Sequence, residues 1–261
     1  MILAFWGDIL KRDLLGETRE EDKFHSKEEL LEYLKSEIER QGENVVIEGC
    51  CLADSIDDLS GLFYKIADGV KSLDLSDWRT SNVVNMSGMF AYCENLEKLD
   101  LSGWNTSNVV NMSGMFAHCE NLKELDLPIP VNVKNLSYMF YKCSNLESLE
   151  LSLWNTTKVE DMFSMFYGCT NLKSLDLTSF DTSNVEDMSL MFANCENLKS
   201  LDLPNWNTSN VVNMSGMFAN CKKLKSLNLS GWNTSKVKDM IGIFDSCPAL
   251  YKVVDNQIIK K

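Results

Sequence analysis

The residues best suited to chemistry in this sequence are cysteines that recur at a regular spacing. Successive members are 26 residues apart, except for one interval of 24. Thiolates are soft ligands, so such a column could serve metal or redox chemistry. Each cysteine, however, ends an apolar Met-Phe or Ile-Phe segment, no Cys-x-x-Cys pair occurs, and free cysteine is among the most buried residue types. We therefore interpret the column as core packing; its members are Cys93, Cys119, Cys143, Cys169, Cys195, Cys221 and Cys247.

The remaining reactive residues form no recognisable catalytic set. The nine cysteines are an odd number, which favours reduced thiols, and Cys50 and Cys51 are the better candidates for exposed, oxidisable ones. Of the two histidines, His25 and His118, the second occupies a column that other units fill with Tyr, Lys, Gly or Asn. A nucleophile needs a base within hydrogen-bond reach, and no Ser-His-Asp set, phosphate-binding glycine loop or zinc spacing appears. We expect no enzyme activity, no catalytic residue, no metal and no cofactor.

A column of acidic residues is a better candidate for a binding site. Like charges about 5 Å apart repel by roughly 1 to 3 kcal/mol per pair, so something must offset the column. One interpretation is local neutralisation by lysines three residues earlier, at Lys71, Lys123, Lys173, Lys199 and Lys225. The other is recognition of a basic partner or a cation. The column consists of Asp74, Asp100, Asp126, Glu150, Asp176 and Asp202, and ends at Asn228.

A second candidate site lies where the units differ from one another. The 24-residue unit has Ile129 and Pro130 where others have a small residue and Trp, and Tyr138 and Tyr141 where Gly and Ala are usual. Clustered aromatic and aliphatic side chains suit an interaction hot spot, whereas Ile129 could equally fill the hole left by the missing tryptophan. The next unit also carries larger residues than its counterparts, at Leu153, Phe163 and Tyr167.

These residues are positioned by a repeated unit of strand, turn and short helix. In one copy, Leu99-Asp100-Leu101 alternates apolar and polar residues, as a strand with one buried face does. Turn-forming residues surround Trp104, and the run from Met112 to Cys119 has the apolar spacing of a helical face, with Ser113 placed to cap it. No unit could bury its apolar residues alone, so the units must stack into an α/β solenoid, with the acidic column on its strand face.

The two ends of the stack differ from its middle. We expect a solenoid over residues 49–261, with a degenerate half-unit at 59–75, seven units ending at the column cysteines, and a C-terminal cap at 248–261, where Val253 and Val254 replace the Leu-x-Leu pair. Residues 1–48 form an N-terminal cap segment. Within it, 26–41 reads as a helix with a Ser26–Glu29 capping box that closes at Gly42. Its apolar face is Leu30, Leu31, Leu34 and Ile38, and residues 45–47 form a strand that could join the first unit.

Charge and hydropathy narrow the classes of partner. The formal net charge of −13 and a pI near 4.7 disfavour nucleic acid as a general partner, because the surface repels phosphates. No apolar run approaches the roughly 20 residues of a membrane helix. The run from Met1 to Leu10 contains Asp8 and lacks a basic region or cleavage site, so we expect no signal peptide. We also expect a monomer.

The pattern resembles a known family of repeats. Leu96, Leu99 and Leu101, followed by Trp104-Asn-Thr-Ser and Met112-Ser-x-Met-Phe, are similar to the BspA-like leucine-rich repeats of bacterial surface proteins and mycoplasma lipoproteins, over about residues 59 to 254. The resemblance implies a right-handed solenoid that adheres to host or neighbouring-cell proteins, at the cell surface or secreted. The chain shows no lipobox cysteine or wall anchor, so as encoded it reads as cytoplasmic. The alternative is a cytoplasmic scaffold or regulator acting through its N-terminal helical segment.

Overall fold

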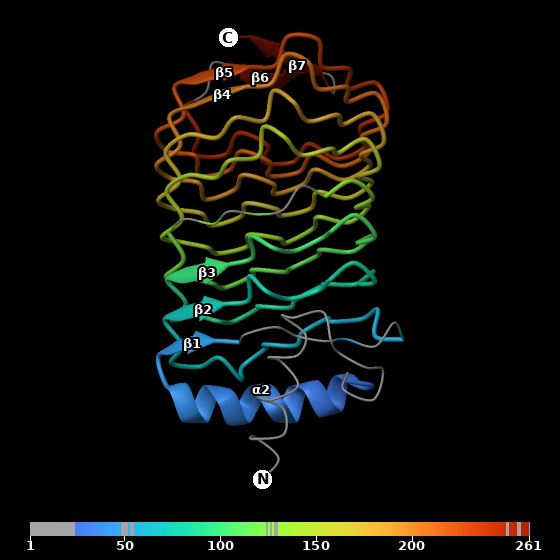
Figure 1. The fold of residues 1–261 in the computed structure, drawn as a ribbon. Helices are drawn as coiled ribbons and strands as arrows, with labels where there is room; N and C mark the ends of the chain where they lie inside the picture. The colour runs from blue at the N-terminus through green and yellow to red at the C-terminus, as the bar shows by residue number, and fades with distance from the viewer. Residues whose placement is uncertain are drawn as a thin grey trace.

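The chain folds into a leucine-rich-repeat solenoid whose coils lie one above the next (Figure 1). The structure is a computed structural model that describes residues 24–47, 52, 55–123, 125, 127, 130–248, 251–254 and 257–260. The predictions that concern Met1 to Leu10, Cys50, Cys51, Asp126 and Ile129 lie outside these residues.

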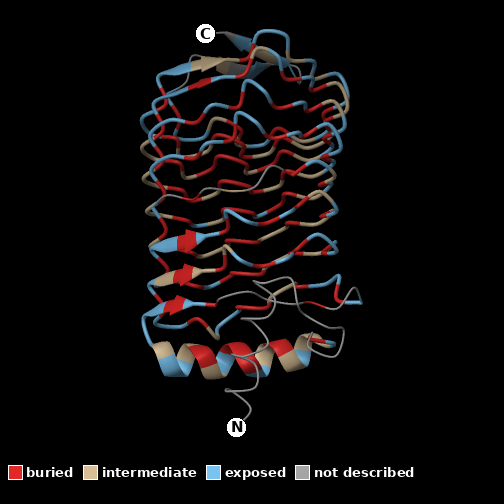
Figure 2. Ribbon diagram, viewed as in Figure 1, coloured by how far each residue is buried: buried red, intermediate tan, exposed pale blue. Residues whose placement is uncertain are grey.

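The strands form one side of the stack. Strands β1 (Asn44–Val46), β2 (Ser72–Asp74) and β3 (Lys98–Asp100) make a parallel three-stranded sheet, and β4 (Ser200–Asp202) pairs in parallel with β5 (Ser226–Asn228). The register aligns the leucines of successive units, so the middle residue of each described strand faces the core (Figure 2). The acidic column of the sequence therefore runs along this strand face, at the exposed end of each strand.

A second ladder runs the length of the stack where the sequence predicted short helices. Parallel bridges join one Asn or Asp of each unit to the next, in the order Asp58, Asn85, Asn111, Asn135, Asp161, Asp187, Asn213 and Asp239. We call this side of the stack the turn face. In each unit it consists of the bridge residue and the ten residues that follow it.

The prediction of a short helix in each unit is wrong. Gly114 and His118 have φ angles of 60° and 62°, which lie in the left-handed region and interrupt a right-handed helix. Alternate N–H groups bond within the unit and across to the next: Met115 N donates to Met112 O at 3.2 Å, and Phe116 N donates to Met139 O at 2.9 Å. Ser113 does not cap a helix; its N–H donates to Asn111 Oδ1 at 3.0 Å.

The interior of the stack consists of aligned columns, one of which holds the cysteines. All seven column cysteines are buried, and none of them forms a disulfide with another described cysteine. Cys143 Sγ donates to Phe116 O at 3.1 Å, and five more of the column make the same contact one unit back. Burial raises the pKa of Cys93 and of Cys195 to about 12, so these thiols stay protonated at neutral pH. The interpretation of the column as core packing is confirmed.

The shortened unit interrupts the tryptophan column. Trp104 Nε1 bonds one unit back to Leu75 O at 2.8 Å, and Trp206 Nε1 bonds to Leu177 O at 3.2 Å. Trp78, the first member of the column, has a buried Nε1 without a hydrogen-bond partner. Trp154 follows the shortened unit, and its buried Nε1 has no hydrogen-bond partner. A void of about 10 Å³ lies between Trp104 and Trp154. The packing is therefore least complete beside the unit that departs from the repeat.

Helix α2 (Lys27–Gln41) lies across the N-terminal end of the stack (Figure 1). Ser26 Oγ accepts from Glu29 N at 3.1 Å, and Gly42 closes the helix with a φ of 75°. Leu30 and Leu34 are fully buried, and Tyr33 packs against Phe24 with ring centroids 5.3 Å apart. The helix predicted from the sequence is present at this end.

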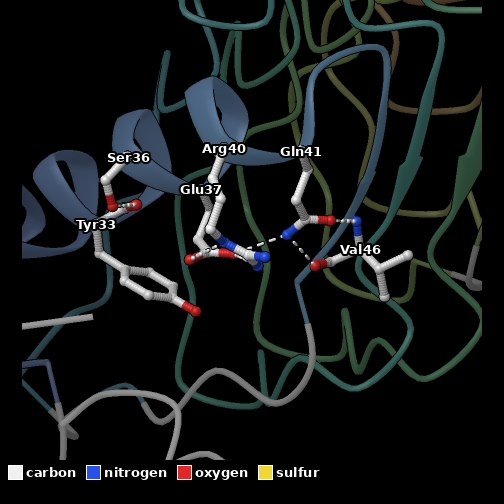
Figure 3. A network of polar contacts seen from close by, with 6 residues as sticks. All are labelled: Tyr33, Ser36, Glu37, Arg40, Gln41 and Val46. Carbon is white, nitrogen blue, oxygen red and sulfur yellow. Dashed lines mark hydrogen bonds and ion pairs between the residues drawn. The ribbon is translucent and has the colours of Figure 1, made fainter. Parts of the chain in front are cut away.

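A side chain of α2 also completes the outer edge of the sheet. Gln41 pairs with the backbone of Val46 in both directions, through Gln41 Nε2 to Val46 O and Val46 N to Gln41 Oε1, each at 2.9 Å (Figure 3). Burial alone would raise the pKa of Glu37, but hydrogen bonds from Arg40 and Gln41 outweigh it and lower the pKa. An edge strand with satisfied backbone groups resists pairing with another chain.

The C-terminal end closes differently. Strands β6 (Tyr251–Val254) and β7 (Gln257–Lys260) form an antiparallel hairpin instead of another coil. Tyr251 packs on Phe244 of the last unit, with ring centroids 6.2 Å apart. Among the described residues, no helix combines the length and apolar character needed to cross a membrane.

Candidate functional site

The acidic column lies on the strand face, where its carboxylates close the turn after each strand. Asp100 Oδ1 accepts from Ser102 N at 3.0 Å, and Glu150 Oε1 accepts from Ser152 N at 2.9 Å. Hydrogen bonds from Thr178 lower the pKa of Asp176, and hydrogen bonds from Ser152 lower the pKa of Glu150. Asp74 makes the same turn, Asp202 accepts from the Asn228 amide at 2.8 Å, and Asp126 lies outside the described residues.

Three of the five lysines expected to neutralise this column pair elsewhere. Lys71 Nζ lies 2.8 Å from a Glu43 carboxylate oxygen, and Lys173 Nζ lies 2.5 Å from one of Glu147. Lys123 Nζ lies 3.9 Å from Glu97, again in its own column one unit back. Glutamate and lysine alternate along this column from Glu43 to Lys173, which favours pairing within the column. Lys199 and Lys225 then follow without an intervening glutamate. Among the described residues, no ion pair involves a carboxylate of the acidic column.

Two shallow hollows mark the strand face. One, of about 610 Å³, is lined by serines and by Asp176, Asp202 and Asn228. The other, of about 770 Å³, lies over Leu99, Leu125 and Leu149, with Glu150 at its border. The uncompensated carboxylates therefore border depressions that a partner side chain could enter.

The turn face carries a continuous group of aromatic side chains. Tyr92 and His118 stack with centroids 4.3 Å apart, and Tyr141 and Tyr167 stack at 4.9 Å. His118 lies 5.4 Å from Tyr141, which links the two pairs. Each contact joins neighbouring units. We call this group the aromatic ladder; its members are Tyr64, Tyr92, His118, Tyr138, Tyr141, Phe163 and Tyr167.

The ladder is a surface feature and not part of the core. Tyr64, Tyr92 and Tyr138 are each more than 40% exposed, although core phenylalanines in the same units are fully buried. Lys65 and Lys142 place their ammonium groups 5.1 and 5.5 Å from the ring centroids of the adjacent tyrosines, Tyr64 and Tyr141. The rings therefore already attract cations from the chain itself.

Three consecutive units carry a side chain at a backbone position where glycine is expected. Tyr138, Ser164 and Leu190 have φ angles of 57°, 53° and 56°, whereas the corresponding residue is glycine in most other units, such as Gly114. A left-handed conformation costs a residue with a side chain roughly 1 to 2 kcal/mol. Ser164 Oγ is, in addition, buried without a hydrogen-bond partner. These three residues therefore lower the stability of the fold, and strained positions of this kind often lie at functional sites.

Two half-buried carboxylates border this part of the ladder. Asp161 and Asp187 are neighbours in the turn-face column, where most other units have asparagine. Burial raises the pKa of Asp161, and the charge of Asp187 adds to the rise. Burial also raises the pKa of Tyr138, with further contributions from Tyr141, Asp161 and Asp187. Phe163 N donates to Asp161 Oδ1 at 2.8 Å, and the Phe163 ring lies 4.8 Å from that of Tyr138, so Asp161 lies beside the ladder.

The structure thus divides the predicted site residues between separate places. Tyr138 and Tyr141 are brought together, with centroids 5.5 Å apart, on the turn face. Leu153 is 70% exposed in the turn that follows the strand position of its unit, and it is not a member of the aromatic ladder. Sequence reasoning missed Tyr64, Tyr92 and His118. For Tyr92 and His118 the signal was present, because both directly precede a column cysteine and residues at the same offset in adjacent units are stacked. Tyr64 had no such signal, because its unit lacks the cysteine.

The described residues contain no cluster of three or more His, Cys, Asp or Glu side chains arranged to hold a metal ion. The exposed columns and hollows that the fold does create are shallow and extended, a geometry that suits a macromolecular surface better than an enclosed small molecule.

Comparison with known proteins shows the family to which the repeats belong. Residues 57–174 and 134–257 match a family model described as Mycoplasma protein of unknown function, DUF285, which confirms the resemblance to BspA-like repeats. No curated protein matches the chain.

Solved structures of leucine-rich repeat proteins are similar to this fold. A leucine-rich repeat protein from Bacteroides ovatus is 22% identical with a TM-score of 0.38; the alignment covers 75% of this chain and 57% of that one. The leucine-rich repeat protein of T. pallidum is 18% identical with a TM-score of 0.39, covering 79% and 77%. An internalin from Listeria monocytogenes is 17% identical with a TM-score of 0.31, covering 95% and 74%. This chain thus spans little more than half the length of the Bacteroides protein.

Proposed function

This chain belongs to the family described as Mycoplasma protein of unknown function, DUF285, and on that premise we propose that it is a non-enzymatic scaffold whose strand face binds a basic protein partner. One observation carries the proposal. The carboxylates of the acidic column that the structure describes make no ion pair, and three of the five neighbouring lysines pair with glutamates of their own column.

The charge of the column is not needed for the turns that it closes. Asn228 occupies the last position of the column and accepts from Ser230 N at 3.1 Å, as the carboxylates do in other units. An amide oxygen therefore serves the turn as well as a carboxylate. What the acidic residues add is a row of negative charge, which steers and orients a basic partner.

The test neutralises the column while keeping its hydrogen-bond acceptors. We expect the combined variant Asp100→Asn, Glu150→Gln, Asp176→Asn and Asp202→Asn to fold normally by circular dichroism. Its affinity for an immobilised oligolysine probe should fall about tenfold or more, because exposed pairs contribute about 0.2–1 kcal/mol each and 1.4 kcal/mol is tenfold. Raising the ionic strength should reduce the difference between variant and parent.

A matched control neutralises the same kind of charge on helix α2. Glu28, Glu32 and Glu39 are exposed on this helix, and their replacement by glutamine should leave oligolysine binding nearly unchanged. Loss of binding in this control, with the strand-face variant unaffected, would overturn the proposal in favour of the alternative, a cytoplasmic regulator that acts through its N-terminal helical segment.

The adhesin-like role implied by the BspA-like resemblance is part of the proposal. It is supported by the family match and by the extended exposed columns. Protease shaving of intact cells of the source organism, followed by detection of the chain, tests it. Loss of the protein on shaving supports adhesion, and protection supports the cytoplasmic regulator.

A further inference from the structure

The aromatic ladder contains side chains that the repeat itself does not require. At the position of Tyr138 the other units mostly have glycine, and at the position of Tyr141 they mostly have alanine. Tyr138 adopts a left-handed φ of 57° and remains 41% exposed, so its ring neither suits the backbone nor fills the core. A strained, exposed aromatic residue suggests binding.

The surroundings of the ladder define the chemistry of its ligand. Lys142 lies over the Tyr141 ring, which shows that the ring faces accept a cation. Asp161 Oδ1 accepts from Phe163 N at 2.8 Å, and the Phe163 ring lies 4.8 Å from that of Tyr138. Asp187 is the neighbour of Asp161 in the turn-face column, and Glu120 lies 3.6 Å from His118 Nδ1. Ring faces bordered by carboxylates suit a planar cation that can stack and form paired hydrogen bonds at once, which is the guanidinium group of arginine.

We propose that the aromatic ladder is a second binding surface, separate from the strand face, and that it takes a protein segment carrying arginine side chains. Stacking of guanidinium groups on Tyr138 and Tyr141 supplies contact area, and Asp161 and Asp187 supply the opposite charge. The same carboxylates repel phosphates, so a nucleic acid is the less favoured ligand.

The test uses variants that bring the ladder back to the repeat consensus. Tyr138→Gly with Tyr141→Ala installs the residues of other units, so the fold should be kept or improved. The parent for this test carries the neutralised strand face described above, which removes binding at the first surface. We expect the double variant to bind an arginine–glycine peptide at least about tenfold more weakly than its parent in a calorimetric titration.

A matched control makes the same kind of change away from the ladder. Ile241 is 81% exposed where most units have serine, and its replacement Ile241→Ser also restores the consensus. Affinity for the arginine–glycine peptide should not change in this control. An equal loss in both variants would show that exposed apolar area, and not the ladder, accounts for binding, and would overturn the proposal.

The choice of probe tests the class of ligand. The parent should bind the arginine–glycine peptide more tightly than a lysine–glycine peptide of equal length, and should not bind a glutamate–glycine peptide. Equal binding of arginine and lysine peptides would overturn the guanidinium assignment. Binding of single-stranded RNA or of an oligosaccharide that is lost in Tyr138→Gly with Tyr141→Ala would assign the ladder to that class instead.

A second variant separates function from stability. Asp161→Asn keeps an acceptor for Phe163 N, which Asp161 Oδ1 now holds at 2.8 Å, and removes one of two adjacent like charges. We expect weaker binding of the arginine peptide together with a higher melting temperature. A variant that lost binding because it lost structure would show the opposite change in stability, and unchanged binding would overturn the role of this carboxylate.

Discussion

The turn face and the strand face run along the same coils, but backbone pairing between units is continuous on the first and interrupted on the second. Turn-face bridges connect every described unit from Asp58 to Asp239. Strand pairs join β1, β2 and β3 and then β4 and β5, and the described residues between β3 and β4 form no further strand pair. Between them the remaining contacts are long, as from Lys199 N to Lys173 O at 3.4 Å, compared with 2.8 Å from Glu97 N to Lys71 O.

The difference indicates that the turn face holds the coils in register. Its residues combine backbone bonds between units with stacked phenylalanines, such as Phe140 and Phe166 at 5.5 Å. The strand face has its hollows at or beside the region where pairing is interrupted. A rigid side thus supports a looser side, where exposed residues can vary without loss of the fold.

The largest expected effect tests this division within one unit. Phe166→Ala removes a fully buried ring from the turn-face stack and should cost about 3–5 kcal/mol in unfolding free energy. Leu149→Ala, in the same unit, truncates a strand-face residue beside an open hollow and should cost about 2 kcal/mol. Urea denaturation followed by circular dichroism measures both. A larger cost for Leu149→Ala would show that the strand side, and not the turn side, holds the stack together.

A smaller effect is expected from the polar residues that close the turns. Asn111 Oδ1 accepts from Ser113 N at 3.0 Å in a half-buried site, and Asp100 Oδ1 accepts from Ser102 N at 3.0 Å in an exposed one. Asn111→Ala should cost about 1–2 kcal/mol, because a shielded donor is left unsatisfied. Asp100→Ala should cost about 0.5 kcal/mol, because water replaces the lost acceptor.

The conservative variants Asn111→Asp and Asp100→Asn are the controls, since both keep the accepting oxygen. Each should recover most of the stability lost in its alanine variant, by the same denaturation measurement. If Asn111→Ala and Asp100→Ala lowered the free energy of unfolding equally, single turn-closing hydrogen bonds would contribute the same stability on both faces.

The architecture could be predicted from the sequence because period and composition determine it. The 26-residue spacing aligns Leu99, Phe116 and Cys119 with their counterparts, and burial of aligned apolar residues leaves little choice but stacking. The Met-Phe segment misled the prediction because its apolar spacing fits a helical face. Residues with left-handed φ angles, such as Gly114 and His118, instead make the segment a series of turns whose N–H groups bond to the next unit.

The candidate site was only partly predictable. The exposure of the acidic column follows from strand alternation. The partners of Lys123 and Lys173 stand at the same position one unit back, so the alternation of lysine and glutamate there could also have predicted them. Tyr138 and Tyr141 were visible as departures from the repeat. The contact of Tyr92 with His118 could also have been predicted, because both directly precede a column cysteine and therefore stack in adjacent units, with centroids 4.3 Å apart.

The smallest expected effect concerns Asp161 and Asp187, two adjacent carboxylates in the bridge column of the turn face. Asp161→Asn should stabilise the chain at neutral pH, because burial and the charge of Asp187 raise the pKa of Asp161 in the folded state. With a folded pKa above the unfolded one, the charged form is penalised only in the fold. The penalty is fully present above the folded pKa and disappears as pH falls below the ordinary aspartate value of about 3.9.

The melting-temperature difference between Asp161→Asn and the parent should therefore be positive at pH 7 and shrink toward zero as the pH approaches 4. Asp239→Asn is the control, because Asp239 ends the same column beside the uncharged Asn213. It lacks a carboxylate neighbour of this kind and should change stability less at pH 7. A melting-temperature difference for Asp161→Asn that stayed constant with pH would mean that the shape of the side chain, and not its charge, causes it. The turn face would then tolerate adjacent carboxylates as readily as the strand face tolerates its acidic column.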